Sequence, residues 1–211
     1  MRAPPDDCQL CPRLAAFRGE QRAAHPDWFN RPVPSFGPLD AAVLVVGLAP
    51  GLRGANRTGR PFTGDYAGDL LYATLLATGF AAGEYKADPQ DGLTLVNCRI
   101  TNAVRCLPPQ NKPVGAEIAN CRPYLRGEIE GVQGLRVIVA LGRIAHDSVL
   151  RALGVRLASY PFAHGALHEV GGLTVADSYH CSRYNTQTGR LTEAMFRSVF
   201  ERVRKTALGS D

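Results

Sequence analysis

Short apolar runs alternate along the chain with segments whose apolar residues recur at helical spacing. The apolar runs cover residues 42–47, 93–97, 136–141 and 174–176. Each run has the length of a buried β-strand, and the first stops at Gly47. Buried strands that alternate with helices indicate a mainly parallel sheet covered by helices on both faces. The pattern predicts an α/β fold: a three-layer α/β/α sandwich around a mainly parallel four-stranded sheet.

Four segments have the spacing of helices, and they cover residues 66–78, 113–130, 143–153 and 192–207. Asp65 precedes the first segment and is a possible N-cap, because its carboxylate can accept the free backbone N–H groups of a helix start. Pro123 is a possible break in the second segment. The last segment carries an apolar stripe that we interpret as core packing: Met195, Phe196, Val199, Phe200 and Val203.

The first 40 residues differ from the rest of the chain. They hold seven prolines, which exclude a long helix but leave room for a short one over residues 13–24. We expect a single domain, residues 1–211, in which residues 1–40 form an N-terminal arm. Ligands of parallel sheets bind beyond the carboxyl ends of the strands. The loops to inspect are therefore those that follow Gly47, Asn97, Leu141 and Ala176.

The composition narrows the class of protein. The 211 residues are 45% hydrophobic and 20% charged, which excludes a disordered chain, a collagen and a disulfide-rich miniprotein. No apolar run approaches the roughly 18–20 residues of a membrane-spanning helix, and the N-terminus has no signal-peptide core. We therefore expect a soluble, cytoplasmic protein with no membrane partner.

The charged residues are biased toward arginine. The 24 lysine and arginine side chains exceed the 19 acidic ones and give a formal charge of +5, yet only Lys86, Lys112 and Lys205 are lysines. Guanidinium groups suit phosphate oxygens and stack on bases, so this balance permits a nucleic-acid partner. A GC-rich genome would produce the same bias without any function, and composition alone does not separate the two explanations.

Six cysteines raise the question of a metal site. Cys8 and Cys11 form a C-x-x-C pair, and Cys106 and Cys121 are separated by 14 residues. Two such pairs can supply four thiolates to one centre, either zinc or an iron–sulfur cluster. The alternative is a set of scattered buried cysteines with one chance pair. The spacing favours a metal site and does not distinguish zinc from iron–sulfur.

Three segments together are much more specific. Residues 47–51 read GLAPG and residues 54–65 read GANRTGRPFTGD; residues 101–109 read TNAVRCLPP; residues 180–186 read HCSRYNT, with TGRL at 188–191. In this order they resemble the uracil-DNA glycosylase superfamily, specifically its family 5 enzymes of bacteria and archaea, which carry a four-iron, four-sulfur (4Fe–4S) cluster. The likeness extends from Cys8 to the terminal helix.

The resemblance implies an enzyme whose partner is DNA containing uracil or other deaminated bases. It would be a monofunctional glycosylase that hydrolyses the N-glycosidic bond of uracil, and of bases such as hypoxanthine. His180 would donate a hydrogen bond to the uracil 2-oxygen as charge grows there, and the Asn102 amide would bind the uracil edge. Asp65 would orient water or stabilise the sugar cation, although capping the helix is an equally strong interpretation. Asp69 is a weaker candidate.

The same motifs imply the other site residues. The base would lie against Gly47, Leu48, Ala49, Phe62, Asn102 and His180, with Phe62 stacking on its ring. DNA contacts would come from Arg53, Asn56, Arg57, Ser182, Arg183 and Tyr184, with Arg190 as a further phosphate contact. The cluster ligands would be Cys8, Cys11, Cys106 and Cys121. Cys98 and Cys181 fall outside that pattern, and Cys181 stands where the family usually has proline. Any one of these residues alone would be interpreted as core or solvated surface.

Two other functions compete with the glycosylase. The first is a catalytically weak DNA-damage binding module on the same fold, because Cys181 and the apolar first motif (GLAPG, residues 47–51) could both lower turnover. The second is a zinc-stabilised nucleotide-binding protein without base chemistry. For the glycosylase, we expect a monomer associated with the nucleoid of a prokaryote. The sequence does not determine whether a sliding clamp is a partner.

Overall fold

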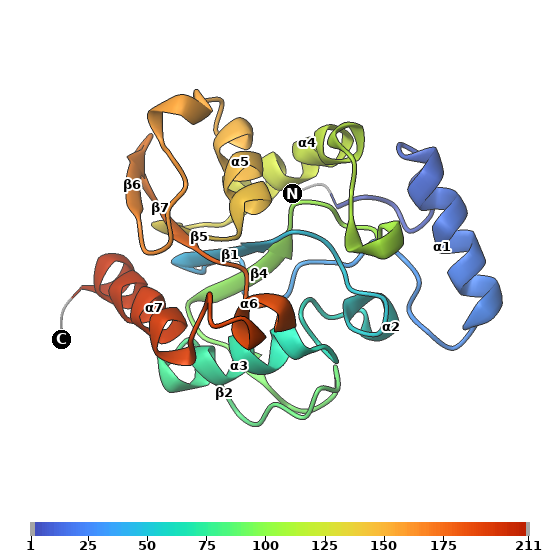
Figure 1. Cartoon of the computed structure of the whole chain (residues 1–211), viewed down its shortest axis with the longest axis horizontal. Coiled ribbons are helices and arrows are strands. Elements are labelled where there is room, and N and C mark those ends of the chain that lie inside the picture. Colours follow the sequence, from blue (N-terminus) through green and yellow to red (C-terminus); the bar gives the residue numbers. More distant parts are fainter. Residues whose placement is uncertain (1–2, 210–211) are drawn as a thin grey trace.

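The computed structural model describes residues 3–209 and has a five-stranded sheet at its centre (Figure 1). Its strands lie in the order β4 (Cys98–Asn102), β1 (Val43–Gly47), β5 (Val137–Leu141), β7 (Leu173–Ser178) and β6 (Leu167–Val170). The first four are mutually parallel, and β6 alone pairs antiparallel with β7. The expected mainly parallel sheet is confirmed, but the prediction of four strands is wrong, because the short, polar β6 (LHEV) has no apolar run.

The prediction of a sheet strand over residues 93–97 is also wrong. This segment contains β3 (Thr94–Leu95), which pairs antiparallel with β2 (Ala81–Ala82) outside the main sheet. The main sheet instead takes β4, whose sequence CRITN interrupts its apolar residues with Arg99 and Thr101. Leu93 and Leu95 are buried because they belong to the core beside the sheet, so their apolarity does not mark a central strand.

Two pairs of helices cover the sheet, one pair on each face (Figure 1). Helices α3 (Tyr66–Ala77) and α7 (Glu193–Leu208) share one hydrophobic core with Val43 and Val45 of β1. Helices α4 (Gly115–Gly131) and α5 (Arg143–Ala152) share the other core with Leu44 and Val46. Successive side chains of a strand point to opposite faces. The expected three layers are therefore confirmed, with an apolar side chain at every position of β1 before Gly47.

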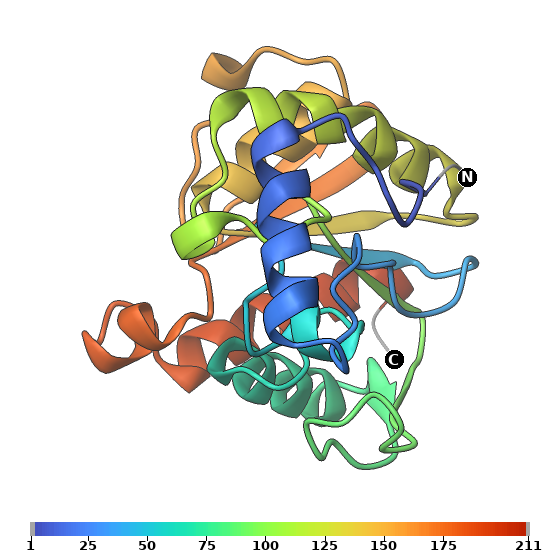
Figure 2. The same ribbon diagram turned by 90° about the vertical axis from the view of Figure 1, so that its right-hand side faces the viewer.

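The remaining elements are short, apart from α1 (Pro12–Ala24), which stands beside α2 (Ala55–Thr58) and α4 (Figure 2). The others are α6 (Arg183–Gln187) and two 3-10 turns, η1 (Pro109–Asn111) and η2 (Leu157–Ser159). Pro123 lies inside α4 without ending it, so the expected break does not occur. No helix within residues 3–209 is long and apolar enough to cross a membrane.

Candidate active site

A cavity of about 400 Å³ lies beyond the carboxyl ends of β1, β4 and β7. This is where a parallel sheet presents the loops that bind ligands. Several residues singled out from the sequence meet there although they come from distant parts of the chain. The predicted residues that line the cavity are Leu48, Ala49, Phe62, Asp65, Asn102, His180, Ser182 and Arg183.

Asn102 presents a buried hydrogen-bond acceptor at this cavity. The pairing of β1 with β4 places it opposite Gly47. Asn102 is 3% exposed, and its Oδ1 has no hydrogen-bond partner within residues 3–209. A Cβ atom at Gly47 would lie 2.4 Å from that Oδ1 and 2.5 Å from Cζ of Phe62, so this position needs glycine. An unsatisfied buried acceptor lowers the stability of the protein by about 1–3 kcal/mol. A ligand that donates an N–H to this oxygen would remove that penalty.

Phe62 is held in a backbone conformation that few non-glycine residues adopt. Its φ is +54°, in the left-handed region. The Tyr85 hydroxyl donates to the Phe62 carbonyl at 3.3 Å, and the Tyr72 hydroxyl donates to the preceding carbonyl at 2.7 Å. Nearby, the Arg60 guanidinium bonds both Asp91 carboxylate oxygens, at 2.8 and 2.7 Å. These contacts fix the ring of Phe62 as a wall of the cavity.

The two oxygens of Asp65 have different surroundings. Oδ1 accepts a hydrogen bond from the Gly68 N–H at 3.1 Å and caps α3. Oδ2 lies against the first-motif loop, where Cβ atoms at Gly51 and Gly54 would come within 2.9 and 2.2 Å of it. Burial raises the pKa of Asp65, and the negative charge of Asp69 adds to the effect. The carboxylate therefore caps a helix and lines the cavity at once, which allows both roles considered from the sequence.

His180 lines the same cavity, with its ring centroid 6.1 Å from that of Phe62. The side-chain amide of Asn185 donates to its carbonyl at 2.8 Å. Gly142, with φ +91°, lets the neighbouring loop approach, since a Cβ atom there would lie 3.3 Å from Cβ of His180. Burial lowers the pKa of His180 to about 4. At neutral pH its imidazole is therefore uncharged and has one N–H to donate.

Cys181 attaches the loop that carries His180 to α3. Its side chain is fully buried, and its Sγ donates to the Ala67 carbonyl at 3.4 Å. Ser182 then caps α6 by accepting the Asn185 N–H at 3.4 Å. The loop that carries His180 is thus attached to α3, which Asp65 caps. The two sides of the cavity are tied together by Cys181.

Several predicted DNA-binding residues are accessible to solvent. Arg53 and Arg57 are exposed, and the side chain of Tyr184 is 71% exposed at the start of α6. Arg183 lines the cavity and lies over the ring of Tyr66 at 5.3 Å. These groups are free to meet a polyanion.

Two other predicted contacts are placed differently. Asn56 is 2% exposed, and its amide donates to Oδ1 of Asn30 at 2.9 Å. This burial argues against the predicted DNA contact of Asn56. Its side chain instead joins α2 to the N-terminal segment. Arg190 lies over the ring of Tyr179 at 4.6 Å and lines a neighbouring groove that shares His180 with the cavity.

Sequence reasoning missed two polar residues of the cavity, Tyr66 and Asn111. Tyr66 directly follows Asp65, but a tyrosine in the first turn of a helix has no distinctive pattern. Asn111 ends η1 with φ +56°. Asparagine tolerates this left-handed conformation better than most residues. Its presence in the sequence can indicate a turn, but it does not show that the turn lies at the cavity.

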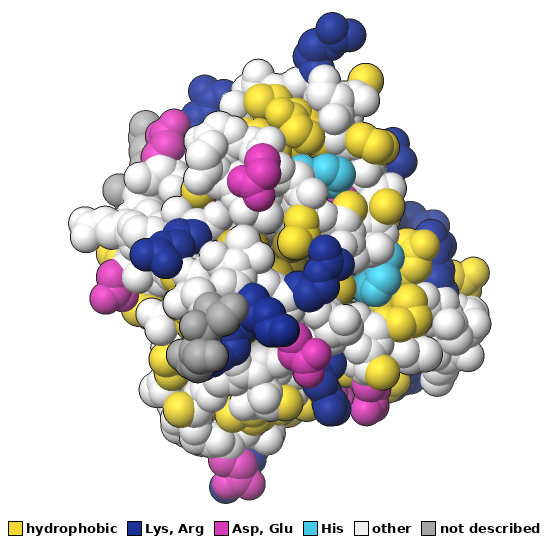
Figure 3. Space-filling model, turned by 90° about the vertical axis from the view of Figure 1, so that its left-hand side faces the viewer, with side chains coloured by type: hydrophobic (Ala, Val, Ile, Leu, Met, Phe, Trp, Pro, Cys, Tyr) yellow, Lys and Arg dark blue, Asp and Glu magenta, His cyan; other side chains and the backbone are white. Residues whose placement is uncertain are grey.

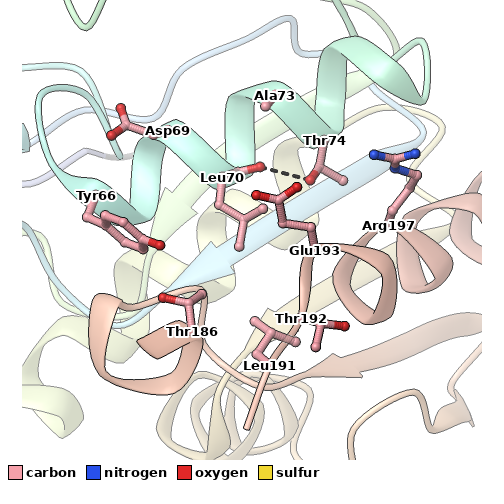
Figure 4. A pocket seen from close by; sticks show the side chains of 10 residues that line it. All are labelled: Tyr66, Asp69, Leu70, Ala73, Thr74, Thr186, Leu191, Thr192, Glu193 and Arg197. Carbon is pink, nitrogen blue, oxygen red and sulfur yellow. Dashed lines mark hydrogen bonds between the residues drawn. The ribbon is translucent and has the colours of Figure 1, made fainter. Parts of the chain in front are cut away.

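A second cavity, of about 420 Å³, lies between α3 and the start of α7 (Figure 4). Asp69 lines this cavity and not the first one, so Asp65 is the better candidate for the carboxylate that acts on water or the sugar. Glu193 and Arg197 are its other charged residues. Two carboxylates against one guanidinium make it a poor site for a phosphate.

The four cysteines of the predicted metal site converge on one small cavity. Cys8 and Cys11 come from the segment that leads into α1, Cys106 follows β4, and Cys121 lies in α4. Backbone N–H of Arg105 donates to Sγ of Cys121 at 3.4 Å. Burial raises the pKa of Cys106 to about 12 and raises those of Cys11 and Cys121. Such thiols would ionise only if a bound cation stabilised the thiolates.

The other two cysteines are isolated. Cys98 opens β4 and is fully buried in the core, as is Cys181.

A further group of possible metal ligands lies where α5 packs beside β6 and β7. His146 Nδ1 lies 2.7 Å from a carboxylate oxygen of Asp177, and its Nε2 lies 2.9 Å from the Tyr160 carbonyl. An ionised carboxylate and a carbonyl only accept, so this pairing requires a proton on both nitrogens. Burial is the largest single influence on the pKa of His146 and lowers it. The hydrogen bond to Asp177 and the negative charge of that carboxylate, with smaller contributions from the Tyr160 carbonyl and Asp147, together outweigh burial, so the net shift is upward. His168 bonds the second oxygen at 3.1 Å. We interpret the group as a buried ion pair.

The fold and the first cavity define a class of protein. A fixed aromatic ring, an unsatisfied amide acceptor and a neutral imidazole surround a space at the carboxyl edge of a parallel sheet. This is a site for a planar, polar heterocycle with an N–H group, and exposed arginines stand near it.

Comparisons with known proteins agree with this class. Residues 34–204 match the family model described as "Uracil DNA glycosylase superfamily". The chain is 46% identical to a type-5 uracil-DNA glycosylase of Thermus thermophilus, over 95% of this chain and 94% of that protein. It is 41% identical to the type-5 uracil-DNA glycosylase of Pyrobaculum aerophilum, over 93% and 87%, and 43% identical to that of Mycobacterium bovis, over 95% and 78%. The chain belongs to the uracil-DNA glycosylase superfamily.

Proposed function

We propose that this protein is a monofunctional uracil-DNA glycosylase that starts base excision repair. It hydrolyses the bond between uracil and C1′ of deoxyribose and leaves an abasic site. The observation that carries the proposal is the buried, unpartnered Oδ1 of Asn102, in a cavity that also holds Phe62 and His180. The chain's relatives are named for this activity.

Binding comes first. The base must leave the DNA stack, at a cost of a few kcal/mol. Stacking on Phe62 and hydrogen bonds to Asn102 offset that cost: Oδ1 accepts the uracil N3–H, and the amide nitrogen donates to the 4-oxygen. Cytosine presents a bare N3 acceptor and an amino donor at these positions. The same amide would oppose it with like groups, which supports selectivity for uracil.

Bond cleavage separates charge, and the site is suited to both parts. As the C1′–N1 bond breaks, its electron pair stays with the base, and negative charge grows on the uracil 2-oxygen. The neutral imidazole of His180 donates a hydrogen bond to that oxygen. Because the pKa of His180 is low, the imidazole keeps its proton-donating N–H without carrying positive charge.

Asp65 acts on the sugar side. Its negative charge stabilises the oxocarbenium-like sugar, and its Oδ2 accepts a proton from the attacking water as the new C1′–O bond forms. The other oxygen of Asp65 remains bonded to α3 and so holds the carboxylate in place. The departing uracil anion is protonated by solvent. Among the described residues that line the cavity there is no lysine to form a Schiff base, which supports an intact abasic product.

DNA contacts would surround this cavity. Arg53, Arg57 and Arg183 would bind phosphates, with Ser182 as a neutral contact. Tyr184, the most exposed aromatic near the cavity, would press into the gap that the extruded base leaves. We propose that the protein acts as a monomer on nucleoid DNA in the cytoplasm of a prokaryote.

The four cysteines are assigned to a 4Fe–4S cluster, the group that the resemblance to the family 5 enzymes implies. Their convergence on one cavity supports a centre held by four thiolates. When bound, the cluster would fasten the start of α1 to α4 and to the segment after β4. No step of base removal passes through it.

The cavity also supports a wider range of bases. Its first-motif wall, Leu48 to Gly51, presents no polar side chain. Hypoxanthine has an N–H beside a carbonyl, as uracil has, and could use the same Asn102 amide. We propose hypoxanthine as a second substrate. If DNA containing inosine releases no base under conditions in which uracil is removed, this extension is wrong.

The proposed activity is tested with a labelled duplex that holds one uracil opposite guanine. The purified protein is incubated with it, and half of each sample is then treated with alkali. A cleaved strand seen only after alkali supports monofunctional base removal. Cleavage before alkali would indicate lyase chemistry. Retained binding without any cleavage would favour the damage-binding module instead.

A further inference from the structure

One charged side chain, Arg18 of α1, stands among the described residues that line the four-cysteine cavity. Its side chain is buried, with the residue 4% exposed. Nη2 donates to the Cys8 carbonyl at 2.9 Å, and Nη1 lies 3.6 Å from Sγ of Cys106, within reach of a hydrogen bond to sulfur. Its Nε has no partner within residues 3–209. Arg18 therefore brings a positive charge and a spare donor to this cavity.

Arg18 lacks the anion that other buried arginines have. Arg60 pairs with Asp91 at 2.7 Å, and Arg105 pairs with Glu128 at 3.0 Å. Among the described residues, no carboxylate forms an ion pair with Arg18. A guanidinium stays charged in proteins, and a buried charge without a counter-charge is strongly destabilising. The protein should therefore supply an anion at this point when it is fully assembled.

We infer that Arg18 is the counter-cation of an anionic centre formed by the four cysteines. Thiolate ligands give such a centre net negative charge, and the Arg18 N–H groups would bond Sγ of Cys106. This inference rests on the proposed cluster and adds a residue that is not one of its ligands. Arg18 is a positioning residue: it acts on the centre and does not touch DNA. It stabilises the reduced form of the cluster more than the oxidised form, because reduction adds negative charge beside it.

The experiment compares Arg18→Met and Arg18→Lys with the wild type, as full-length protein prepared without oxygen. Arg22→Met is the matched control. Arg22 lies one turn along the same helix, but its guanidinium is paired with Asp7 at 2.6 Å on the surface. Iron content, the visible absorbance of the cluster, its rate of loss to a chelator and its midpoint potential are measured for each protein.

For Arg18→Met, we expect cluster loss about 10- to 100-fold faster than in the wild type, the usual effect of removing an outer partner of a metal site. Its midpoint potential should become more negative. Arg18→Lys keeps the charge, so its rate of cluster loss and its midpoint potential should lie between those of the wild type and Arg18→Met. Arg22→Met should match the wild type in both. Equal loss rates and potentials in Arg18→Met and the wild type would overturn the inference.

Thermal unfolding separates a counter-cation from a packing residue. With the cluster bound, Arg18→Met should be less stable than the wild type. After the cluster is removed, the difference should vanish or reverse, because the substitution then deletes a buried charge without an anion. Equal destabilisation of both forms would show that Arg18 acts only through packing and the bond to Cys8. A wild-type protein without iron would refute the proposed cluster itself. If zinc is found instead, its loss to the chelator tests Arg18 in the same way.

Discussion

At the scale of single residues, the site depends on groups with two duties. Asp65 uses one oxygen to cap α3 and leaves the other against Gly51 and Gly54 at the cavity. The cap bond therefore also holds in place the oxygen that we propose acts on water. Asn185 also has two roles: its side-chain amide donates to the His180 carbonyl, and its backbone N–H donates to the Ser182 hydroxyl that caps α6. Local structure and chemistry are therefore coupled in the same side chains, and substitutions must be chosen to separate them.

Two substitutions of Asp65 separate its roles. Asparagine caps helices about as well as aspartate, so Asp65→Asn should leave the melting temperature nearly unchanged. It removes the charge and the base, so single-turnover uracil excision should fall by about 10²- to 10⁴-fold, the usual share of a general base. Asp65→Ala should lose both activity and about 1 kcal/mol of stability. Wild-type rates in Asp65→Asn would reduce Asp65 to a helix cap.

The low pKa of His180 predicts a particular pH dependence. Because the imidazole is neutral down to about pH 4, its protonation should not affect excision between pH 5 and 7. Single-turnover rates over this range should therefore lack a step near 6.5, the ordinary value for histidine. Comparison of wild type with His180→Asn isolates the contribution of the ring. A step near pH 6.5 that disappears in the variant would show that the imidazolium, not the imidazole, matters.

At the scale of elements, register decides which side chains meet. The parallel pairing of β1 and β4 puts Gly47 beside Asn102, and the missing side chain of Gly47 leaves room for the amide and for Phe62. The last residue of β1 must therefore be glycine to leave room for the cavity wall. This requirement arises from the pairing of two strands and cannot be seen in either strand alone.

Gly47→Ala tests this requirement. The added methyl group would overlap Oδ1 of Asn102 and the ring of Phe62, which must move apart. We expect a loss of uracil excision of at least tenfold in kcat/KM, with a folded protein, because overpacking costs about 1–3 kcal/mol. Gly127→Ala in α4, where a Cβ meets nothing within 4 Å, is the control and should be fully active. Full activity of Gly47→Ala would mean that the cavity tolerates a shifted Asn102.

The ion pair of His146 and Asp177 joins α5 to β7 and predicts how stability varies with pH. The pKa of His146 is raised in the folded protein, so its stabilisation is complete below the unfolded value of about 6.5 and is lost as pH rises through the folded value. His146→Gln should cost about 3–5 kcal/mol at pH 6 and less at pH 9. Denaturant unfolding at both pH values measures this, with His25→Gln as control. A pH-independent cost would contradict a charged pair.

Most of the element pattern could be predicted from the sequence, but not all of the sheet. Continuous apolar runs marked β1 and β5 because these central strands are buried on both faces. At the position next to β1, β4 carries Arg99, whose Nε bonds a Glu128 oxygen, so a charge interrupts its pattern. An ion pair between a strand and a helix cannot be read from either segment alone. The same limit explains why burial of Asn56, which depends on Asn30, was not foreseen.

At the scale of the whole molecule, three separate chain segments, residues 47–65, 101–111 and 180–183, build one cavity. The motifs were recognisable in the sequence, and the order of the parallel strands brings them together. Figure 3 shows the side of the molecule that carries β6 and the end of α7, where acidic and basic side chains are interspersed. A surface of mixed sign is not suited to a long polyanion, which agrees with DNA binding at the carboxyl edge of the sheet instead.

The central claim is that uracil is removed in the cavity formed by Asn102, Phe62 and His180. The most direct test is the single-turnover rate of Asn102→Ala on a duplex with one uracil, beside its affinity for a duplex that already holds an abasic site. We predict that excision falls by at least about 100-fold, as for other groups that stabilise developing charge, while affinity for the abasic duplex stays within a few-fold of the wild type. An unchanged excision rate would contradict the claim and place the reaction elsewhere in the molecule.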